Sequence, residues 1–192
     1  MEEILLIGGG GHCKSVIDVI EQENRFKIAG IVDQREFIGS KVLGYKIIAC
    51  DDDLKALSEK YKYICITVGQ IKSADIRVRL YELVKNFGFV LPVIISPRAY
   101  VSKYAQIKEG SVIMHDAMVN AEVKISENCI INTKALIEHD CEVQAHCHIS
   151  TGAIVNGGVK IGERSFIGSN AVTKEYISIE ENSFIKAGSL VK

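Results

Sequence analysis

The stretch from residue 101 to residue 191 repeats every six residues, and this period constrains the fold more than any other feature of the chain. Sixteen positions at this spacing start at Val101, and fifteen of them are isoleucine or valine, with Thr173 as the exception. The residue four places after each is nearly always small. A six-residue period fits neither an α-helix nor simple strand alternation, whereas it is typical of a parallel β-helix with stacked coils. We expect the branched residues to fill the interior and the small residues to lie at the corners.

Three hexads make one triangular coil, so residues eighteen apart should lie above one another, and the sixteen positions give about five coils. The pattern resembles that of left-handed β-helices, and the left hand is taken from this resemblance because the general crossover rule favours the right hand. The lapse at Thr173, followed by Ile177 where a small residue is usual, predicts a local bulge. The alternative fold, a β-sandwich, would need turn residues at a spacing of about 8–12 positions.

The composition limits the possible partners and location. The chain has 192 residues and a formal net charge of −1, so there is no electrostatic reason to expect nucleic acid or an acidic membrane as partner. No apolar run reaches the roughly 18 residues of a membrane span, and Gly8 interrupts the apolar start too early for a signal peptide. We therefore expect a cytoplasmic protein without membrane insertion. Its six cysteines should then be reduced, with Cys129 and Cys147 stacked on successive coils.

A glycine-rich loop follows the first predicted strand. Residues 4–7 are apolar, residues 8–11 are all glycine, and His12 then leads into a helix that runs from about residue 13 to residue 23. A strand, a glycine loop and a helix in this order direct backbone N–H groups at an anion. The dinucleotide fingerprint would need a third glycine at Cys13, so the loop predicts a phosphate or polar sugar ligand rather than NAD. A tight turn that merely requires glycine is the alternative.

The rest of the N-terminal part alternates strands with helices. Strands are predicted at 27–32, 63–68 and 89–95, and helices near 51–57 and 76–87. This order predicts a small parallel sheet covered by helices. Asp33 and Gly69 follow two of the strands, so both fall with the glycine loop at the carboxyl edge, where such sheets bind ligands. Three successive acids at 51–53 indicate a helix start rather than a metal site. We therefore predict a Rossmann-like domain at 1–96 and a β-helix domain at 97–192.

His139 is the strongest catalytic candidate. It is flanked by Glu138 and Asp140 and lies two residues past Ile137, so we expect it to point outward from a strand face. A carboxylate beside an imidazole fixes its tautomer and increases its basicity, which suits a general base. An ordinary surface histidine is the alternative.

A metal site is a weaker candidate. It would use His115, His146 and His148, as some left-handed β-helix carbonic anhydrases bind zinc with three histidines across an interface. His146 and His148 straddle a corner at Cys147, however, where strand alternation fails. We therefore expect no metal.

Two segments of the chain resemble motifs of a known family. The run from Gly8 to Lys14 resembles that family's Gly-x-x-Gly-His-x-x opening, and residues 137–141, with His148 nine residues after His139, resemble its catalytic segment. The family is the sialic-acid O-acetyltransferase type, which includes the nucleotide-amino-sugar N-acetyltransferases of bacterial glycan synthesis. The resemblance covers essentially the whole chain.

The resemblance implies an acetyltransferase that uses acetyl-CoA without a metal. It implies a homotrimer whose active sites lie between adjacent β-helices. His139 would be the general base, and Asp140 would occupy the position of an acid that is commonly Glu in the family. His148 would touch the thioester end of acetyl-CoA, with Ser169 and Ala187 along the pantetheine. The residues implied for the nucleotide-sugar are Gly10, Gly11, His12, Asp33 and Gly69.

The predicted function is acetylation of the amino group of a nucleotide-linked amino sugar in bacterial surface-glycan synthesis. O-acetylation of a sialic-acid-like sugar is the nearest alternative, because nothing in the sequence separates an amine acceptor from a hydroxyl. A non-catalytic trimeric β-helix that binds a nucleotide-sugar, and a metal-dependent lyase, are alternatives from other classes.

Overall fold

The computed structural model describes all residues from 1 to 192, and the chain divides into two compact units. The first unit contains Met1–Gly69 and Ile76–Pro92, and the second contains Gln70–Asp75 and Val93–Lys192. The main division thus falls after Pro92, whereas the sequence placed it after residue 96. The assignment of a separate role to each part stays a prediction.

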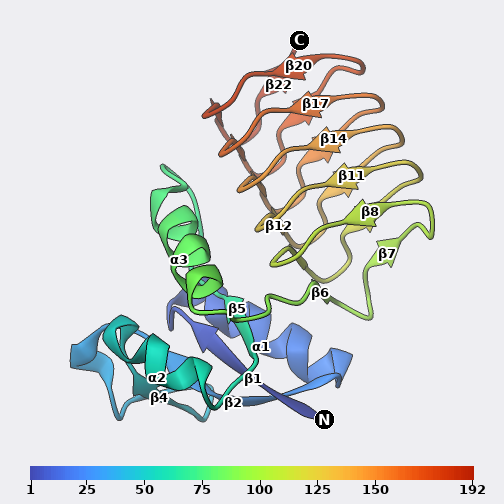
Figure 1. The fold of residues 1–192 in the computed structure, drawn as a ribbon. Coiled ribbons are helices and arrows are strands. Elements are labelled where there is room, and N and C mark those ends of the chain that lie inside the picture. Colours follow the sequence, from blue (N-terminus) through green and yellow to red (C-terminus); the bar gives the residue numbers. More distant parts are fainter. The chain divides into compact units, whose positions relative to one another are not determined.

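The first unit is built on a five-stranded sheet in the order β3-β4-β2-β1-β5. The strands are β1 (Glu2–Ile7), β2 (Phe26–Val32), β3 (Lys41–Val42), β4 (Tyr45–Ala49) and β5 (Tyr63–Ile66). All neighbours are parallel except the hairpin of β3 and β4. The helices are α1 (Gly11–Glu23), α2 (Leu54–Ser58) and α3 (Asp75–Asn86), with short 3₁₀ turns η1 (Arg35–Phe37) and η2 (Asp51–Asp53). Figure 1 shows these elements along the chain.

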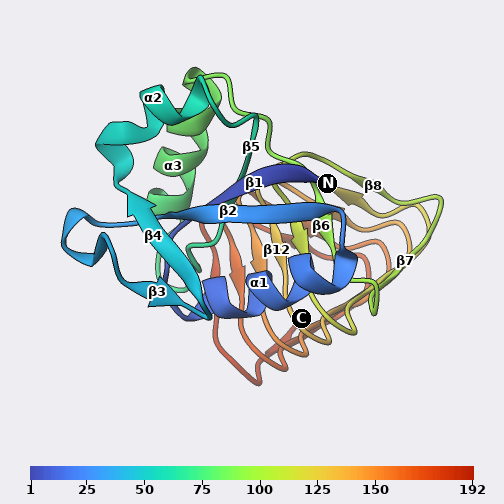
Figure 2. The ribbon, with the colours of Figure 1, turned by 90° about the horizontal axis from the view of Figure 1, so that it is seen from below.

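Helices cover both faces of this sheet. Leu5 and Ile7 of β1 pack in one cluster with Leu54 of α2 and Leu80 of α3, so α2 and α3 share a face. Helix α1 lies along the opposite face (Figure 2). Its apolar residues recur at helical spacing and are buried, and the helix ends at Asn24, which adopts the left-handed conformation common at helix ends. The predicted alternation of strands and helices is therefore confirmed.

Two parts of this unit differ from the sequence-based expectation. The predicted strand at 89–95 is wrong, because Val90 forms only an isolated bridge to Tyr63 and Ile94 already belongs to the second unit. The hairpin of β3 and β4 was not predicted. Its turn contains Leu43 and Gly44, both with positive φ, but β3 has only two residues and gives too short an alternation to recognise.

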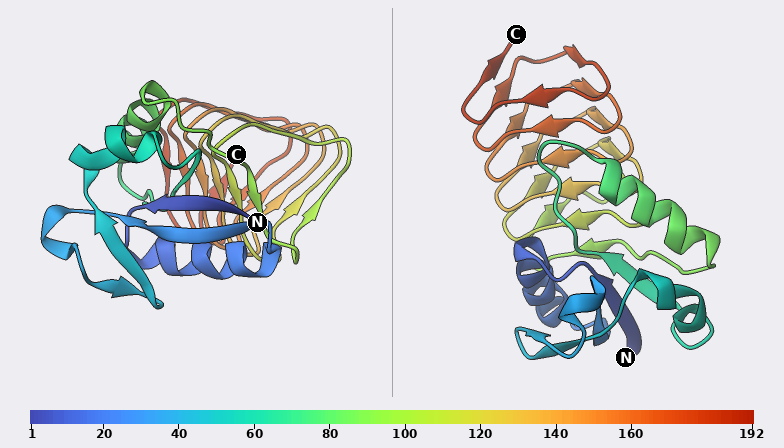
Figure 3. Two further views of the ribbon diagram at one scale, coloured as in Figure 1. Left: turned by 60° about the horizontal axis from the view of Figure 1, so that its bottom comes forward. Right: turned by 90° about the vertical axis from the view of Figure 1, so that its left-hand side faces the viewer.

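The second unit is a left-handed parallel β-helix, as predicted. Its coils stack one upon another, with strands of successive coils above each other (Figures 1 and 3). Three sheets of six, five and six two-residue strands form its faces. The strands are β6 (Ile94–Ile95), β7 (Tyr100–Val101), β8 (Gln106–Ile107), β9 (Val112–Ile113), β10 (Met118–Val119), β11 (Lys124–Ile125), β12 (Ile130–Ile131), β13 (Leu136–Ile137), β14 (Glu142–Val143), β15 (His148–Ile149), β16 (Ile154–Val155), β17 (Lys160–Ile161), β18 (Phe166–Ile167), β19 (Val172–Thr173), β20 (Ser178–Ile179), β21 (Phe184–Ile185) and β22 (Leu190–Val191).

Residues eighteen apart pair between coils, as the repeat predicts. Ile137, for example, pairs with Val119 below and Val155 above, and all three are buried in the interior. The small residue four places later, such as Cys141, is also buried inside, directly after the turn. The turn itself is made by the preceding residue in the left-handed conformation, for example Asp140 with φ 61°. The small residues therefore line the interior beside each corner rather than forming the turn.

Thr173 changes the hydrogen-bond ladder, but the bulge predicted there is absent, because β19 pairs with its neighbours without a shift in register. At the neighbouring coils the residue after the inward position donates its backbone N–H to a backbone carbonyl, as Glu138 does to Val155 at 2.9 Å. Asn156 instead donates its N–H to the Thr173 hydroxyl at 2.9 Å, and its side-chain amide donates to the Thr173 carbonyl at 2.7 Å. The buried hydroxyl thus replaces one ladder bond just before Gly157.

All six cysteines are free thiols and are buried. The contact with the Cys129 side chain, followed by burial, raises the pKa of the Cys147 thiol, so this thiol stays protonated. None of the helices combines the length and the apolar character that crossing a bilayer requires.

Candidate active site

His139 lies in the turn that follows β13, and its ring faces outward. The sequence placed it on a strand face, which is wrong, because the two-residue strand ends at Ile137. Its Nδ1 lies 2.8 Å from Oδ2 of Asp140, and both side chains are about half exposed, at 53% and 60%. A carboxylate can only accept, so Nδ1 carries the proton and Nε2 is left with a free lone pair. That arrangement presents a hydrogen-bond acceptor, and a potential base, at the surface of the β-helix.

The second acid beside His139 has a different role. The Glu138 carboxylate accepts a hydrogen bond of 2.8 Å from the side-chain amide of Asn120, eighteen residues earlier. This bond ties Glu138 to the coil below and leaves Asp140 as the acid that orients the imidazole. The residues alone did not separate the two acids, whereas the family resemblance pointed to Asp140.

Gly157 provides the space that the His139 ring occupies, and it was not among the residues predicted from the sequence. A Cβ atom at this position would lie 2.8 Å from Cε1 and 2.9 Å from Nε2 of the ring. Any side chain there would therefore displace the imidazole. Gly157 is eighteen residues after His139, so the predicted stacking of coils was the signal that could have found it.

His148 is buried in the second unit, with only 6% of its surface exposed. Its Nδ1 lies 2.5 Å from the carbonyl oxygen of Gln70, which can only accept, so Nδ1 carries a proton. Its Nε2 lies 3.0 Å from the amide nitrogen of Asn132, whose oxygen accepts the N–H of Thr133 at 2.8 Å. The amide of Asn132 is thus oriented to donate to Nε2. The ring also meets Phe166 edge to face, with 5.2 Å between centroids.

The residues predicted to line acetyl-CoA lie at one corner of the β-helix. Ser169 shares a hydrogen bond of 3.0 Å with Ser150, and its carbonyl accepts the N–H of Gly188 at 2.8 Å. Ala187 follows one coil later and is exposed. The residues at this corner on four successive coils have short side chains: Thr133, Thr151, Ser169 and Ala187. A column without long side chains leaves the backbone at this corner accessible to an extended chain, and the assignment of Ser169 and Ala187 to acetyl-CoA stays a prediction.

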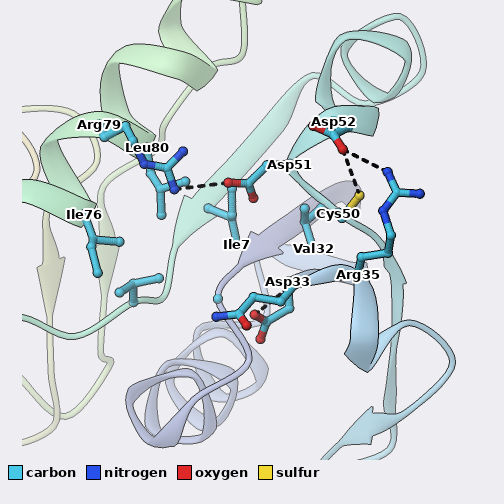
Figure 4. Close-up of a pocket in the computed structure, with 13 residues that line it drawn as sticks. Ile7, Val32, Asp33, Arg35, Cys50, Asp51, Asp52, Ile76, Arg79 and Leu80 are labelled. Carbon is cyan, nitrogen blue, oxygen red and sulfur yellow. Dashed lines mark hydrogen bonds and ion pairs between the residues drawn. The ribbon is translucent and has the colours of Figure 1, made fainter.

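The first unit contains a cavity of about 330 Å³ at the carboxyl ends of its strands, a size that suits part of a small ligand. Figure 4 shows Asp33 on its wall together with two ion pairs, Arg35 with Asp52 and Arg79 with Asp51. The sequence predicted Asp33 here but missed both arginines. The remaining lining residues are Ile7, Gly8, Val32, Gln34, Cys50, Val68, Ile76 and Leu80.

The three acids at 51–53 divide between two tasks. Asp53 accepts the backbone N–H of Cys50 at 3.0 Å, and this bond lowers the pKa of its carboxyl. The predicted helix start is therefore confirmed for Asp53. Asp51 and Asp52 instead pair with arginines at the cavity.

The glycine loop is held next to Asp33. One carboxylate oxygen of Asp33 accepts the N–H of Gly9 at 2.6 Å, and the other accepts the N–H of Gln34 at 2.7 Å. Gly69 lies close to His12, because a Cβ at Gly69 would be 3.5 Å from Cβ of His12. The structure thus brings Asp33 to the loop and Gly69 to His12.

Gly10 and Gly11 are open to solvent. An added Cβ would meet nothing within 4 Å at either position. Gly10 precedes the first turn of α1, so backbone N–H groups there are accessible to a ligand. These two glycines, His12 and Gly69 do not line the cavity, so a ligand that uses all the predicted residues must extend beyond it.

The histidines proposed as metal ligands make other contacts. Nδ1 of His115 lies 2.6 Å from the hydroxyl of Ser96, and Nδ1 of His146 lies 2.9 Å from the amide of Asn128. No three His, Cys, Asp or Glu side chains of the chain are grouped as metal ligands.

Known proteins share both the sequence and the architecture. Residues 3–84 match the family model described as the PglD N-terminal domain. PerB from Caulobacter crescentus, solved with CoA and GDP-perosamine, is 31% identical with a TM-score of 0.93, over 100% of this chain and 89% of that one. The acetyltransferase domain of PglB from Neisseria gonorrhoeae, solved with acetyl coenzyme A, is 32% identical with a TM-score of 0.89, over 99% and 92% of the two chains.

A histidine variant of the perosamine N-acetyltransferase from Caulobacter crescentus, in complex with CoA and GDP-perosamine, is 30% identical with a TM-score of 0.93, over 100% and 89% of the chains. Among curated proteins the search found no match.

A Rossmann-like unit followed by a left-handed β-helix that carries an acid-paired histidine defines an acetyltransferase of the hexapeptide-repeat class. The chain belongs to the family of nucleotide-amino-sugar N-acetyltransferases.

Proposed function

We propose that this enzyme transfers an acetyl group from acetyl-CoA to the amino group of a nucleotide-linked amino sugar, in the synthesis of a bacterial surface glycan. The observation that carries the proposal is the contact of 2.8 Å between His139 and Asp140 on the outside of the β-helix. It gives a member of this family an oriented base on the exposed surface of the β-helix.

His139 is the general base of the proposed reaction. The lone pair of the acceptor amine attacks the thioester carbonyl carbon, and the carbon–sulfur bond then breaks. Nε2 takes the proton that the nitrogen loses, and the departing sulfur is protonated to give the CoA thiol. A well-placed base contributes a factor of roughly 10²–10⁴ to the rate. No covalent intermediate on the protein is required.

Backbone and positioning supply the rest of the catalysis. The tetrahedral intermediate carries an oxyanion, which N–H donors stabilise. The backbone of Gly157 lies against the His139 ring, so its N–H is the candidate donor. Bringing donor and acceptor together on this surface lowers the entropic part of the barrier.

The acceptor is bound by the first unit. Gly10, Gly11 and His12 hold the diphosphate and sugar, because the start of α1 offers free N–H groups to anions. Asp33 binds the nucleotide of the acceptor, and Gly69 lies beside it. The charged groups of Arg35 and Arg79 at the cavity add hydrogen-bond donors for the nucleotide.

The donor is bound by Ser169 and Ala187, and the predicted contact of His148 with the thioester is replaced by a supporting part. Ser169 and Ala187 present their backbone to the pantetheine chain from the corner of short side chains. His148 is almost fully buried in the single chain. Its part is therefore to fix the surface near the thioester through its bonds to Gln70 and Asn132.

The enzyme acts as a homotrimer. The outer face of the sheet that contains β13 is an uninterrupted apolar ladder, whereas the sheet that contains β14 carries polar and charged residues. The apolar ladder consists of Tyr100, Met118, Leu136, Ile154, Val172 and Leu190. Tyr100 and Leu190 are 56% and 63% exposed in the single chain. An apolar face of this length favours burial against a second copy, and β13 leads directly to His139, so such a copy would border the active site.

Light scattering tests the trimer. The wild-type protein should have three times the mass of the chain, and Leu136→Lys should yield monomers because it places a charge in the centre of the apolar ladder. The matched control is Glu142→Lys on the polar sheet, which should remain trimeric. If the wild-type protein were a monomer, no active site could be shared between subunits, and this part of the proposal would be wrong.

The reaction takes place in the cytoplasm, where acetyl-CoA is available. Cell fractionation with an antibody to the native protein tests this, and recovery from the periplasm or the outer surface would contradict it.

The function is tested by thiol release from acetyl-CoA against a panel of UDP-, GDP- and CMP-linked amino sugars. One member of the panel should release CoA thiol and gain the mass of one acetyl group, on nitrogen. Release with a sialic-acid-like sugar and an O-acetyl product would identify the O-acetyltransferase instead. Absence of turnover with nucleotide-sugar binding intact would favour a binding protein.

A further inference from the structure

Three successive coils place His139, a pair of glycines and Tyr176 at one corner of the β-helix. Gly158 donates its N–H to the carbonyl of His139 at 2.9 Å, and Tyr176 donates its N–H to the carbonyl of Gly157 at 2.9 Å. These bonds align the three turns in a column, with the glycine pair in the middle.

The rings of His139 and Tyr176 both lie over the glycine pair. A Cβ on Gly157 would approach Cε1 and Nε2 of His139, and a Cβ on Gly158 would overlap Cδ1 and Cε1 of Tyr176. One ring comes from the preceding coil and the other from the following coil. Because both glycines lack side chains, the next side chains along this corner toward the C-terminus belong to Glu175 and Tyr176, and it is the Tyr176 ring that lies over the glycine pair.

Tyr176 is an unusual residue for its backbone position. Its φ is 55°, and it is the one phenylalanine or tyrosine of the chain with a positive φ. Bulky residues rarely adopt this conformation, and most other corners use Asn, Asp, charged residues or glycine there. The side chain is also 73% exposed. Stability of the coil does not explain an exposed ring on an unfavourable backbone, and such positions are often functional.

The position of Tyr176 along the axis favours the acyl donor as its contact. Ser169 and Tyr176 lie in the turns at the two ends of β19, and Ala187 lies one coil further. The residues proposed for the donor all follow His139 in the β-helix. A donor whose thioester reaches His139 therefore extends toward these later coils, past the bare glycine pair and the Tyr176 ring.

We infer that Tyr176 is a positioning residue for acetyl-CoA: its ring packs against the cysteamine end of the pantetheine and holds the thioester beside Nε2 of His139. This inference rests on the proposed function. The ring face offers apolar contact to the methylene groups of the pantetheine. The hydroxyl is not required for that contact.

The test compares Tyr176→Asn, Tyr176→Phe and Tyr104→Ala with the wild-type enzyme. Asn is chosen because it tolerates a positive φ, as Asn170 and Asn182 do in this fold. Tyr104 is the matched control, since it lies at the same corner four coils earlier and is 58% exposed. Calorimetric titration with CoA, steady-state KM values for both substrates and the melting temperature are measured for each protein.

Tyr176→Asn should weaken CoA binding and raise the KM of acetyl-CoA about tenfold, with the KM of the acceptor unchanged. Tyr176→Phe should restore both values, and Tyr104→Ala should match the wild type. Normal CoA affinity in an active Tyr176→Asn enzyme would overturn this inference alone, as would an effect confined to the acceptor KM. A wild-type protein that does not bind CoA would overturn the inference together with the proposed function.

Discussion

Oδ2 of Asp140 accepts a hydrogen bond of 2.8 Å from Nδ1 of His139, the residue directly before it in the chain. The left-handed conformation of Asp140, with φ 61°, makes this contact between neighbours possible, because it turns the carboxylate back toward the ring. The same turn that closes the corner of the β-helix thus orients the base.

Asp140→Asn should lower kcat while leaving the substrate KM values nearly unchanged. The amide can still bond Nδ1 through its oxygen, but it no longer stabilises the protonated ring, and a flipped amide would favour the other tautomer. We expect a loss of at least about tenfold. The matched control is Glu122→Gln at the same corner one coil earlier, also with a positive φ of 61°, which should keep full activity. Equal kcat values for Asp140→Asn and the wild type would remove Asp140 from the site.

Gly157→Ala should reduce activity without a comparable loss of stability. The new methyl group would lie within 2.9 Å of the His139 ring, which can swing away into solvent. A displaced base is expected to reduce kcat about a hundredfold. Activity and thermal unfolding are measured on the same preparation.

Gly162→Ala is the matched control for Gly157. Its methyl group would overlap the backbone of Glu181 and Glu180, which cannot move aside as a side chain can. We expect a loss of about 1–3 kcal/mol in unfolding free energy, with turnover retained in the folded fraction. If Gly157→Ala lost stability but kept its turnover, while Gly162→Ala lost turnover but kept its stability, the assigned role of Gly157 would be contradicted.

His12→Ala should raise the KM of the acceptor about tenfold, as expected for one lost hydrogen bond to a charged ligand, and should leave the KM of acetyl-CoA unchanged. Gln22→Ala at the far end of the same helix is the control, because its amide bonds only the exposed Asp18. If acetyl-CoA were the substrate whose KM rises, the glycine loop would be misassigned.

The stability of the enzyme should fall between pH 9 and pH 12. Burial raises the pKa of Cys65 to about 12 and that of Cys13 to about 11, from an ordinary value of 9.0. Above pH 9 the unfolded chain loses these protons and the folded chain keeps them, so stability is complete below pH 9 and declines as the pH rises toward the folded values. Each such thiol contributes a slope of about 1.4 kcal/mol per pH unit.

Urea unfolding at a series of alkaline pH values measures this decline. Cys65→Val should make the decline in unfolding free energy between pH 9 and pH 12 less steep. Below pH 9 the pH dependence of the variant should run parallel to that of the wild type. An identical alkaline slope in the variant would show that Cys65 does not titrate in this way.

The repeat in the sequence was sufficient to predict the β-helix, because each hexad repeats the same geometric requirement. It also placed His139 and Asp140 together, since they are adjacent. The position of His139 in a turn was missed because the strands have only two residues, which a repeat of six cannot reveal. Gly157 was missed although it lies eighteen residues on, because Asn-Gly-Gly reads as an ordinary turn.

Other contacts lie beyond what a sequence pattern can show. The bond between His148 and Gln70 joins residues 78 positions apart, and no periodicity relates them. The same is true of Arg35 and Arg79, which reach the cavity from separate elements to pair with Asp52 and Asp51. The strand predicted at 89–95 failed because its apolar residues pack against two different units.

Steady-state turnover of acetyl-CoA by His139→Ala, compared with the wild type on the same nucleotide-linked amino sugar, tests the central claim most directly. Removal of the only proposed base should lower kcat by about 10²-fold or more, with the melting temperature and the affinity for CoA unchanged. A kcat within tenfold of the wild-type value, in a folded protein that still binds both substrates, would contradict the account.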